Sequence, residues 1–243
     1  MGDVADTTFS KSADRCGAGE PAFNGTVDDV VIYASVEPID GAGSILGSAG
    51  PCFVRSSNTL PLYGTMRFDS ADVDGLGDRF EDVILHEMGH VLGVGTIWSS
   101  KNLLTFNGSS CLNSSVISFT GSEARAQYAV LGGSGNVPVE NGGGSGTKCG
   151  HWDEETFDNE LMTGFLNGGS ANPLSIITAG SMQDLGYSVD LAATDSYSVP
   201  SCSPACLRAD HADEDIHIAQ REVILEPIGV VSPDGQIRSL DQE

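Results

Sequence analysis

The chain has 243 residues, of which 34 are acidic and 11 basic, so its formal net charge is −23. A field this negative repels nucleic acid and anionic membranes, which excludes both as partners, and no apolar run approaches the roughly 18–20 residues that a membrane-spanning helix needs. The hydrophobic fraction of 40% supports a packed core. We expect one large domain over residues 1–200 and an acidic tail over 201–243 with a small β appendage.

Two strands are predicted in the first third of the chain. Residues 29–36 are apolar and β-branched, which indicates a buried strand, and the 28 residues before it read as loop. The Gly-rich stretch from Asp40 to Gly50 is also predicted to be loop. Residues 62–68 form the second strand, and we expect it at a sheet edge because Gly64 and Arg67 do not suit a fully buried position.

The clearest helix runs from Asp78 to Leu92. Asp78 with Glu81 three residues later resembles a capping box, and Gly93 stands where a glycine commonly ends a helix. At 100° per residue the apolar side chains fall on one face, and two histidines fall on another. The helix therefore has a side that faces the core and a side that is free for function.

The second half of the chain begins with a polar stretch rich in Gly and Ser at 99–150, which predicts a long insertion with a short helix near 123–131. Asn172 followed by a proline predicts the start of another helix, which runs to Leu185. Beyond residue 200, two short apolar segments and a turn predict the small β appendage, at 223–225 and 229–231.

Six cysteines without a C-x-x-C pair are typical of disulfides in an oxidising compartment, so an extracellular or cell-surface location is expected. Six cysteines allow 15 pairings, and their order along the chain favours 16–52, 111–149 and 202–206. The first residues have neither the basic nor the apolar region of a signal peptide. We therefore expect the chain to start downstream of its natural N-terminus.

His86, Glu87 and His90 form an H-E-x-x-H motif inside the predicted helix. Imidazoles at i and i+4 lie on one helix face, where both can bind one zinc ion. Zinc lowers the pKa of a bound water to about 7, and Glu87 would act as the general base that passes its proton to the leaving amine. Two histidines on an amphipathic helix could instead be structural, but only five histidines occur in the chain, so a chance match is improbable.

A catalytic zinc needs a third protein ligand. In the compact pattern H-E-x-x-H-x-x-G-x-x-H the third histidine follows the glycine turn. Here Gly93 is present, but Thr96 occupies the position of the histidine. His151, at the end of the insertion, is the favoured third ligand, because two histidines alone leave the zinc one protein ligand short.

Other third ligands remain open at this point. A glutamate serves in some H-E-x-x-H enzymes, and Glu123 and Glu140 are the candidates here. The two remaining histidines, His211 and His217, lie in the acidic tail and are expected to be solvated. The glycine turn and a methionine downstream argue against the glutamates.

The motif helix, the long insertion, His151 followed by Trp152, and Met162 eleven residues after His151 resemble the leishmanolysin family of metzincins. In that family an inserted segment displaces the third zinc histidine from the helix, and a methionine turn forms an apolar floor below the metal. The resemblance implies an α+β zincin fold, with a mixed twisted sheet, the active-site helix, and a C-terminal subdomain that holds the methionine turn and a helix. It also implies that His151 is the third zinc ligand and Met162 the turn methionine.

Such folds begin with a strand and a long helix, which the first 28 residues of this chain do not provide. We therefore interpret this segment as a truncated N-terminus. The leading prediction is a zinc endopeptidase that uses Glu87 to activate the zinc-bound water and cleaves extended protein or peptide substrates. Strand 62–68 would pair with the substrate backbone, and residues near Met162 and 137–141 would line its side-chain pockets.

Two alternatives accompany this prediction. The chain could be a truncated, catalytically inactive binding or surface module that keeps the zinc fold, or a metallohydrolase of non-peptide amides. A second metal, calcium, is indicated weakly by a partial calcium loop with Ser in the first ligand position, formed by Ser70, Asp72, Asp74, Gly75 and Glu81. The sequence indicates no oligomeric state.

Overall fold

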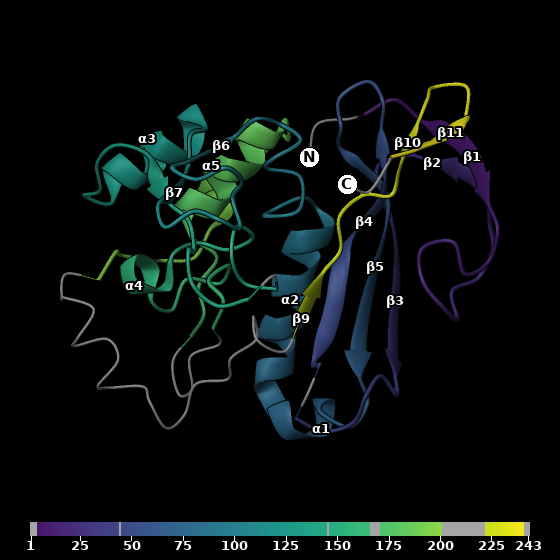
Figure 1. Cartoon of the computed structure of the whole chain (residues 1–243), viewed down its shortest axis with the longest axis horizontal. Coiled ribbons are helices and arrows are strands. Elements are labelled where there is room, and N and C mark those ends of the chain that lie inside the picture. The colour runs from purple at the N-terminus through teal and green to yellow at the C-terminus, as the bar shows by residue number, and fades with distance from the viewer. Residues whose placement is uncertain (1–3, 44, 145, 166–170, 201–221, 241–243) are drawn as a thin grey trace.

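The computed structural model describes residues 4–43, 45–144, 146–165, 171–200 and 222–240. The chain is mixed α+β: a twisted sheet forms one side of the molecule and a lobe of short helices and loops forms the other (Figure 1). Helix α2 (Phe80–Val91) lies between these two parts. Within the described residues, no helix is long and apolar enough to cross a membrane.

The main sheet has six strands. Five of them follow the order β11-β10-β4-β5-β3, and β9 pairs with the same edge of β4 as β10 does. Strand β4 runs antiparallel to β5, whereas β3 runs parallel to β5 and both β9 and β10 run parallel to β4. The strands are β3 (Val31–Glu37), β4 (Gly47–Arg55), β5 (Pro61–Asp69), β9 (Glu222–Ile224), β10 (Gly229–Val231) and β11 (Ile237–Ser239).

The strand predicted over residues 62–68 exists as β5, but its placement at a sheet edge was wrong. It pairs with β4 on one side and β3 on the other. A Cβ on Gly64 would lie 2.5 Å from Val91 Cγ1, so this glycine lets α2 pack close to the sheet. Arg67 is accommodated by an ion pair of 3.5 Å with Glu37.

The outer edge of β4 is covered by the C-terminal part of the chain. The two segments predicted to form a small β appendage are strands, but they join the main sheet: β9 pairs with Gly47–Ala49 and β10 with Phe53–Arg55. The predicted loop over Asp40–Gly50 was therefore wrong at its end, because β4 already begins at Gly47. The domain boundary at residue 200 stays a prediction.

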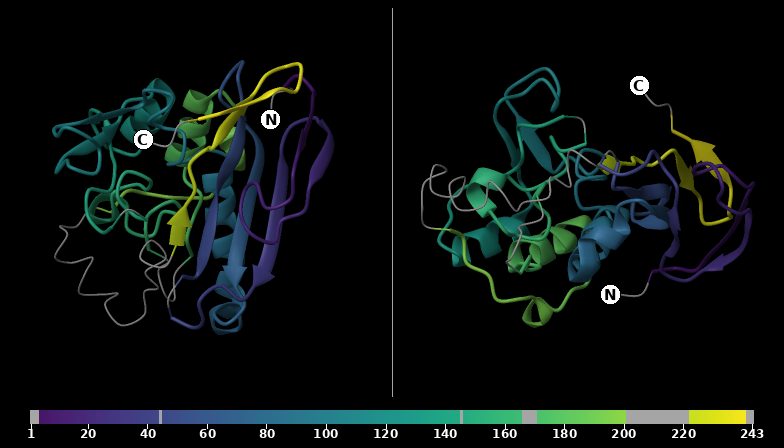
Figure 2. Two further views of the ribbon diagram at one scale, coloured as in Figure 1. Left: turned by 45° about the vertical axis from the view of Figure 1, so that its right-hand side comes forward. Right: turned by 90° about the horizontal axis from the view of Figure 1, so that it is seen from below.

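The N-terminal residues that read as loop contain a hairpin of β1 (Thr7–Lys11) and β2 (Phe23–Val27). Alternate side chains of β1 are buried, and Phe9 packs against Phe53 and Tyr63 of the main sheet. The hairpin thus covers one face of the sheet while α2 covers the other (Figure 2). The prediction of loop missed the period-2 pattern of this short segment.

Helix α2 is close to its predicted range, and Gly93 follows its end with φ of 112°. The predicted capping box was wrong. Asp78 lies in a 3₁₀ turn, η1 (Gly77–Arg79), that follows the short helix α1 (Val73–Leu76), and no side chain caps the start of α2. The 3₁₀ turn leads directly into the helix, so the chain needs no separate cap there.

The second lobe is built from the insertion and the chain that follows it. The predicted short helix is α3, and the predicted helix ending at Leu185 is α5, capped by Ser175 rather than Asn172. The lobe comprises β6 (Leu104–Phe106), β7 (Ile117–Phe119), α3 (Ser122–Val130), β8 (Val137–Pro138), α4 (Glu154–Phe157), α5 (Ile176–Leu185) and the 3₁₀ turn η2 (Leu191–Ala193).

Two of the three predicted disulfides are confirmed. Cys16–Cys52 ties the loop of the N-terminal hairpin to β4, and Cys111–Cys149 joins the two halves of the insertion. The third predicted pair, 202–206, lies outside the described residues. The second disulfide ends two residues before His151, so it limits where the insertion returns to the helix.

Candidate metal centre

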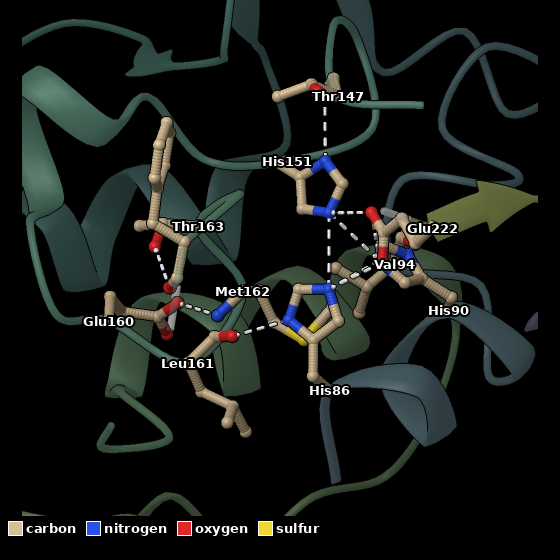
Figure 3. Close-up of polar contacts among 11 residues, drawn as sticks. His86, His90, Val94, Thr147, His151, Glu160, Leu161, Met162, Thr163 and Glu222 are labelled. Atoms are coloured by element: carbon tan, nitrogen blue, oxygen red, sulfur yellow. Dashed lines mark hydrogen bonds and ion pairs between the residues drawn. The ribbon is translucent and has the colours of Figure 1, made fainter. Parts of the chain in front are cut away.

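Two histidines of α2, His86 and His90, meet a third, His151, that follows the insertion (Figure 3). The Nε2 atom of His90 lies 3.0 Å from that of His86 and 3.1 Å from that of His151, and the remaining Nε2 separation is 3.2 Å. All three side chains are fully buried. The structure thus brings together the three residues that the sequence proposed as zinc ligands.

Each imidazole is oriented by a backbone carbonyl on its other nitrogen. Nδ1 of His86 lies 2.7 Å from the carbonyl oxygen of Leu161, and the corresponding distances are 2.9 Å from His90 to Val94 and 2.9 Å from His151 to Thr147. A carbonyl oxygen only accepts, so each Nδ1 carries a proton, and in the neutral ring Nε2 then presents a lone pair. Three lone pairs therefore point into the same small space.

A fourth buried group, Glu222 at the start of β9, completes the cluster. Its Oε1 lies 2.6 Å from Nε2 of His151 and 3.8 Å from that of His90, and its Oε2 lies 3.2 Å from Nε2 of His86. The ligand atoms of all four residues lie within 4.8 Å of one another. Sequence reasoning missed Glu222, because a single glutamate among 34 acidic residues carries no signal of its own.

The donor set fits a zinc ion. Four lone-pair-bearing atoms in a dry site repel one another unless a cation lies among them. With Zn–N bonds of about 2.0–2.1 Å, a tetrahedral ion separates its nitrogen ligands by about 3.3 Å, close to the spacing of the three Nε2 atoms. Three imidazoles and one carboxylate are also the ligand types that zinc takes in proteins.

Glu87 lies beside this cluster rather than in it. Its side chain is buried, and Oε1 has no hydrogen-bond partner among the described residues. Burial raises the pKa of Glu87 well above its ordinary range, and the nearby charge of Glu222 raises it further. Burial would also raise the pKa of Glu222, but the three imidazoles outweigh this effect and hold that pKa well below its usual value.

Met162 lies under the motif helix. A Cβ on Gly89 would approach its Sδ to 2.6 Å, so the glycine between Glu87 and His90 makes room for this thioether. The backbone N–H of Trp152 donates to the carbonyl of Met162 at 3.0 Å, which joins the chain after His151 to the turn that holds the methionine. Met162 is thus buried against the helix at Gly89, the residue before His90.

The alternative ligands lie elsewhere. Glu123 is exposed on α3, and the carboxylate of Glu140 accepts backbone N–H bonds from Gly142 at 2.7 Å and Glu154 at 3.1 Å. Thr96, at the position of the missing histidine, donates its hydroxyl to the carbonyl of His90 at 2.8 Å. Its role is therefore to hold the turn after the helix.

Two further predictions from the sequence concern the tail histidines and a calcium loop. His211 and His217 lie outside the described residues. Within the part of the chain that the structure describes, the only group of three or more potential metal-ligand side chains is the histidine cluster, and the segment around Asp72 forms none. Calcium stays a prediction.

The family model described as leishmanolysin matches residues 21–201 of the chain. The chain belongs to the leishmanolysin family. The match covers α2, the insertion, His151 and Met162, and it ends before Glu222. Members of this family are zinc-dependent metallopeptidases, and membership together with the two disulfides favours an extracellular or cell-surface location. The curated proteins contain no match to the chain.

Proposed function

We propose that this leishmanolysin-family chain is a zinc-dependent endopeptidase with a metzincin fold. The observation that carries the proposal is the convergence of three imidazole Nε2 lone pairs, from His86, His90 and His151, on one buried point. These residues would hold the zinc ion. The glycine turn at Gly93 and the thioether of Met162 would support the ligands from the end of the helix and from below.

When bound, zinc polarises a peptide carbonyl and lowers the pKa of a water molecule. Glu87 is the group placed to handle the proton. It follows His86 directly on the helix, is buried, and has an oxygen free of other donors. It would accept the proton of the attacking water and deliver it to the leaving amine. A raised pKa suits this role, because it strengthens the carboxylate as a base toward the proton of the water.

Substrate binding is proposed at the outer edge of β4, in place of the strand first expected from the sequence. Residues Gly47–Ala49 lie beside the cluster and already accept a paired strand, β9. A Cβ on Gly47 would lie 3.1 Å from Oε1 of Glu87, which puts this edge next to the proposed base. An extended peptide could add to it by backbone hydrogen bonds, with little dependence on sequence.

The test is cleavage of an unstructured protein such as casein, with and without a zinc chelator. It uses the chain as it is and Glu222→Ala, because Glu222 covers the cluster. We expect chelator-sensitive cleavage by the Glu222→Ala variant. Adding Glu87→Ala should lower its cleavage rate by about 10²–10⁴-fold. Zinc content should not change, since Glu87 is not a ligand. Glu81→Gln, an exposed position on the same helix, is the control.

The competing function is a catalytically inactive binding or surface module. It is favoured by one observation: the three histidines and Glu87 are buried in this structure. Folded, zinc-loaded protein that cleaves nothing, even after the change Glu222→Ala, would establish that reading and reject the peptidase.

A further inference from the structure

Strand β9 is seated on the edge of β4 by a specific arrangement. Glu222, Val223 and Ile224 pair with Gly47, Ser48 and Ala49, and the N–H of Leu225 donates to Ala49 at 2.8 Å. A Cβ on Gly50 would lie 2.0 Å from the carbonyl oxygen of Leu225. A glycine at this position is therefore required for the segment to lie this close to β4.

The first residue of β9 directs its carboxylate into the histidine cluster (Figure 3). The side chain of Glu222 is fully buried, and its Oε1 lies 2.6 Å from Nε2 of His151, whose Nδ1 lies 2.9 Å from the carbonyl oxygen of Thr147. No other carboxylate in the described residues joins the cluster. A carboxylate and an imidazole nitrogen this close either share a proton or lie around a cation, and three imidazoles with one carboxylate are ligand types that zinc takes.

The position of Glu222 closes the site. A catalytic zinc has three protein ligands and keeps its fourth position for water and substrate, whereas a site with four protein ligands is closed. Backbone pairing of β9 also occupies the strand edge on which a substrate peptide would lie. A cleft of about 930 Å³ opens along β4 and Ile224–Ile228, but none of the four cluster residues lines it.

The pairing that holds β9 is short. Strand β9 contributes three paired residues, and Val223 at its centre is 40% exposed, so few contacts hold it compared with a core strand. It enters the site through a side chain, and the peptide groups of Glu222 are paired with β4 rather than presented to the metal. The segment can thus occupy the site without being a substrate.

We propose that Glu222 is the fourth ligand of the zinc ion and that β9 holds the peptidase in a latent form. The inference rests on the proposed zinc site. It adds a metal ligand, Glu222, that lies outside the residues matched by the family, and it assigns strand β9 as an internal inhibitor. Displacement of β9 exposes the fourth zinc position and the β4 edge together.

The test replaces zinc by Co²⁺, whose visible absorption reports the number of ligands, and titrates acetohydroxamate as a small metal-binding probe. Glu222→Ala should show a changed spectrum and bind the probe about tenfold or more tightly than the unchanged chain. This factor means that β9 is displaced in about one-tenth or less of the unchanged molecules. Glu222→Gln keeps the size of the side chain and should change in the same direction. Glu226→Ala, an exposed glutamate on the same segment, should match the unchanged chain.

Equal spectra and equal probe affinity in the unchanged chain and both Glu222 variants would overturn the proposal. Loss of the metal from Glu222→Ala would overturn the latent form, because it would make Glu222 a permanent structural ligand. Neither readout depends on peptide cleavage. If the probe site opens but casein is not cleaved, the assignment of Glu222 stands and the peptidase proposal fails. If both hold, cleavage by Glu222→Ala should exceed that of the unchanged chain by a similar factor.

Discussion

Nδ1 of His86 donates to the carbonyl oxygen of Leu161 at 2.7 Å, so the first histidine of the motif is oriented by the residue just before Met162. The link joins α2 to the methionine turn, 75 residues later in the chain. It fixes the imidazole tautomer and directs Nε2 into the cluster. The turn is itself held from behind by Glu160, whose Oε2 accepts the N–H of Met162 at 2.6 Å.

The change Glu160→Gln should destabilise the protein. The buried carboxylate accepts bonds from Met162, from both the N–H and the hydroxyl of Ser175, and from the hydroxyl of Thr178. An amide would place a donor against these donors, at a cost of about 1–3 kcal/mol. Thermal unfolding measures the effect, as a fall in Tm of about 2–4 °C per kcal/mol. Glu123→Gln, exposed on α3, is the control, and equal Tm values for the two variants would contradict the prediction.

The change Gly89→Ala should destabilise the protein by overpacking. Its methyl group would approach Sδ of Met162 to 2.6 Å, and forcing extra volume into a packed site costs about 1–3 kcal/mol. Gly75→Ala is the matched control, since a Cβ there meets nothing within 4 Å. Denaturant unfolding of both variants compares them directly.

A double-mutant cycle sharpens this prediction. Met162→Ala alone leaves a cavity and costs about 2–5 kcal/mol. Combined with Gly89→Ala, it removes the atom that the new methyl group would meet, so the double change should cost less than the sum of the single changes. Additive effects would show that Gly89 and Met162 do not share the contact seen here.

The two disulfides should have different effects on metal binding. They close loops of similar length, with separations of 36 and 38 residues, so replacing either pair by serine should cost about 4 kcal/mol in the chain-entropy account. Only Cys111–Cys149 lies next to His151. Its removal should weaken zinc binding as well, whereas removal of Cys16–Cys52 should lower only the stability. Isothermal titration with zinc separates these outcomes, and equal zinc affinities would contradict the account.

Local patterns in the sequence were reliable guides to part of this site. The spacing of His86, Glu87 and His90 and the apolar period around them fall within one helix, so their arrangement follows from helix geometry. His151 and Met162 were inferred from ligand count and family resemblance, and the structure puts both at the cluster.

Features decided by distant contacts were not predictable in this way. Gly64 suggested an edge strand, but its partner is Val91 in a helix that follows later. Asn172 suggested a helix cap, yet its amide donates to Asp82 at 3.0 Å and Ser175 takes the capping role. Glu222 lies 136 residues from His86 in the chain, and only the pairing of β9 with β4 brings it to the cluster.

The most direct test of the central claim is the zinc affinity of His151→Ala, measured in the Glu222→Ala background so that no fourth ligand compensates. His211→Ala, a tail histidine predicted from the sequence to be solvated, is the control. We predict about one zinc ion per chain in the background and in the control, and an affinity lower by about 100-fold or more in His151→Ala, because two ligands do not hold a zinc ion tightly. Retention of zinc by His151→Ala with unchanged affinity would contradict the three-histidine site.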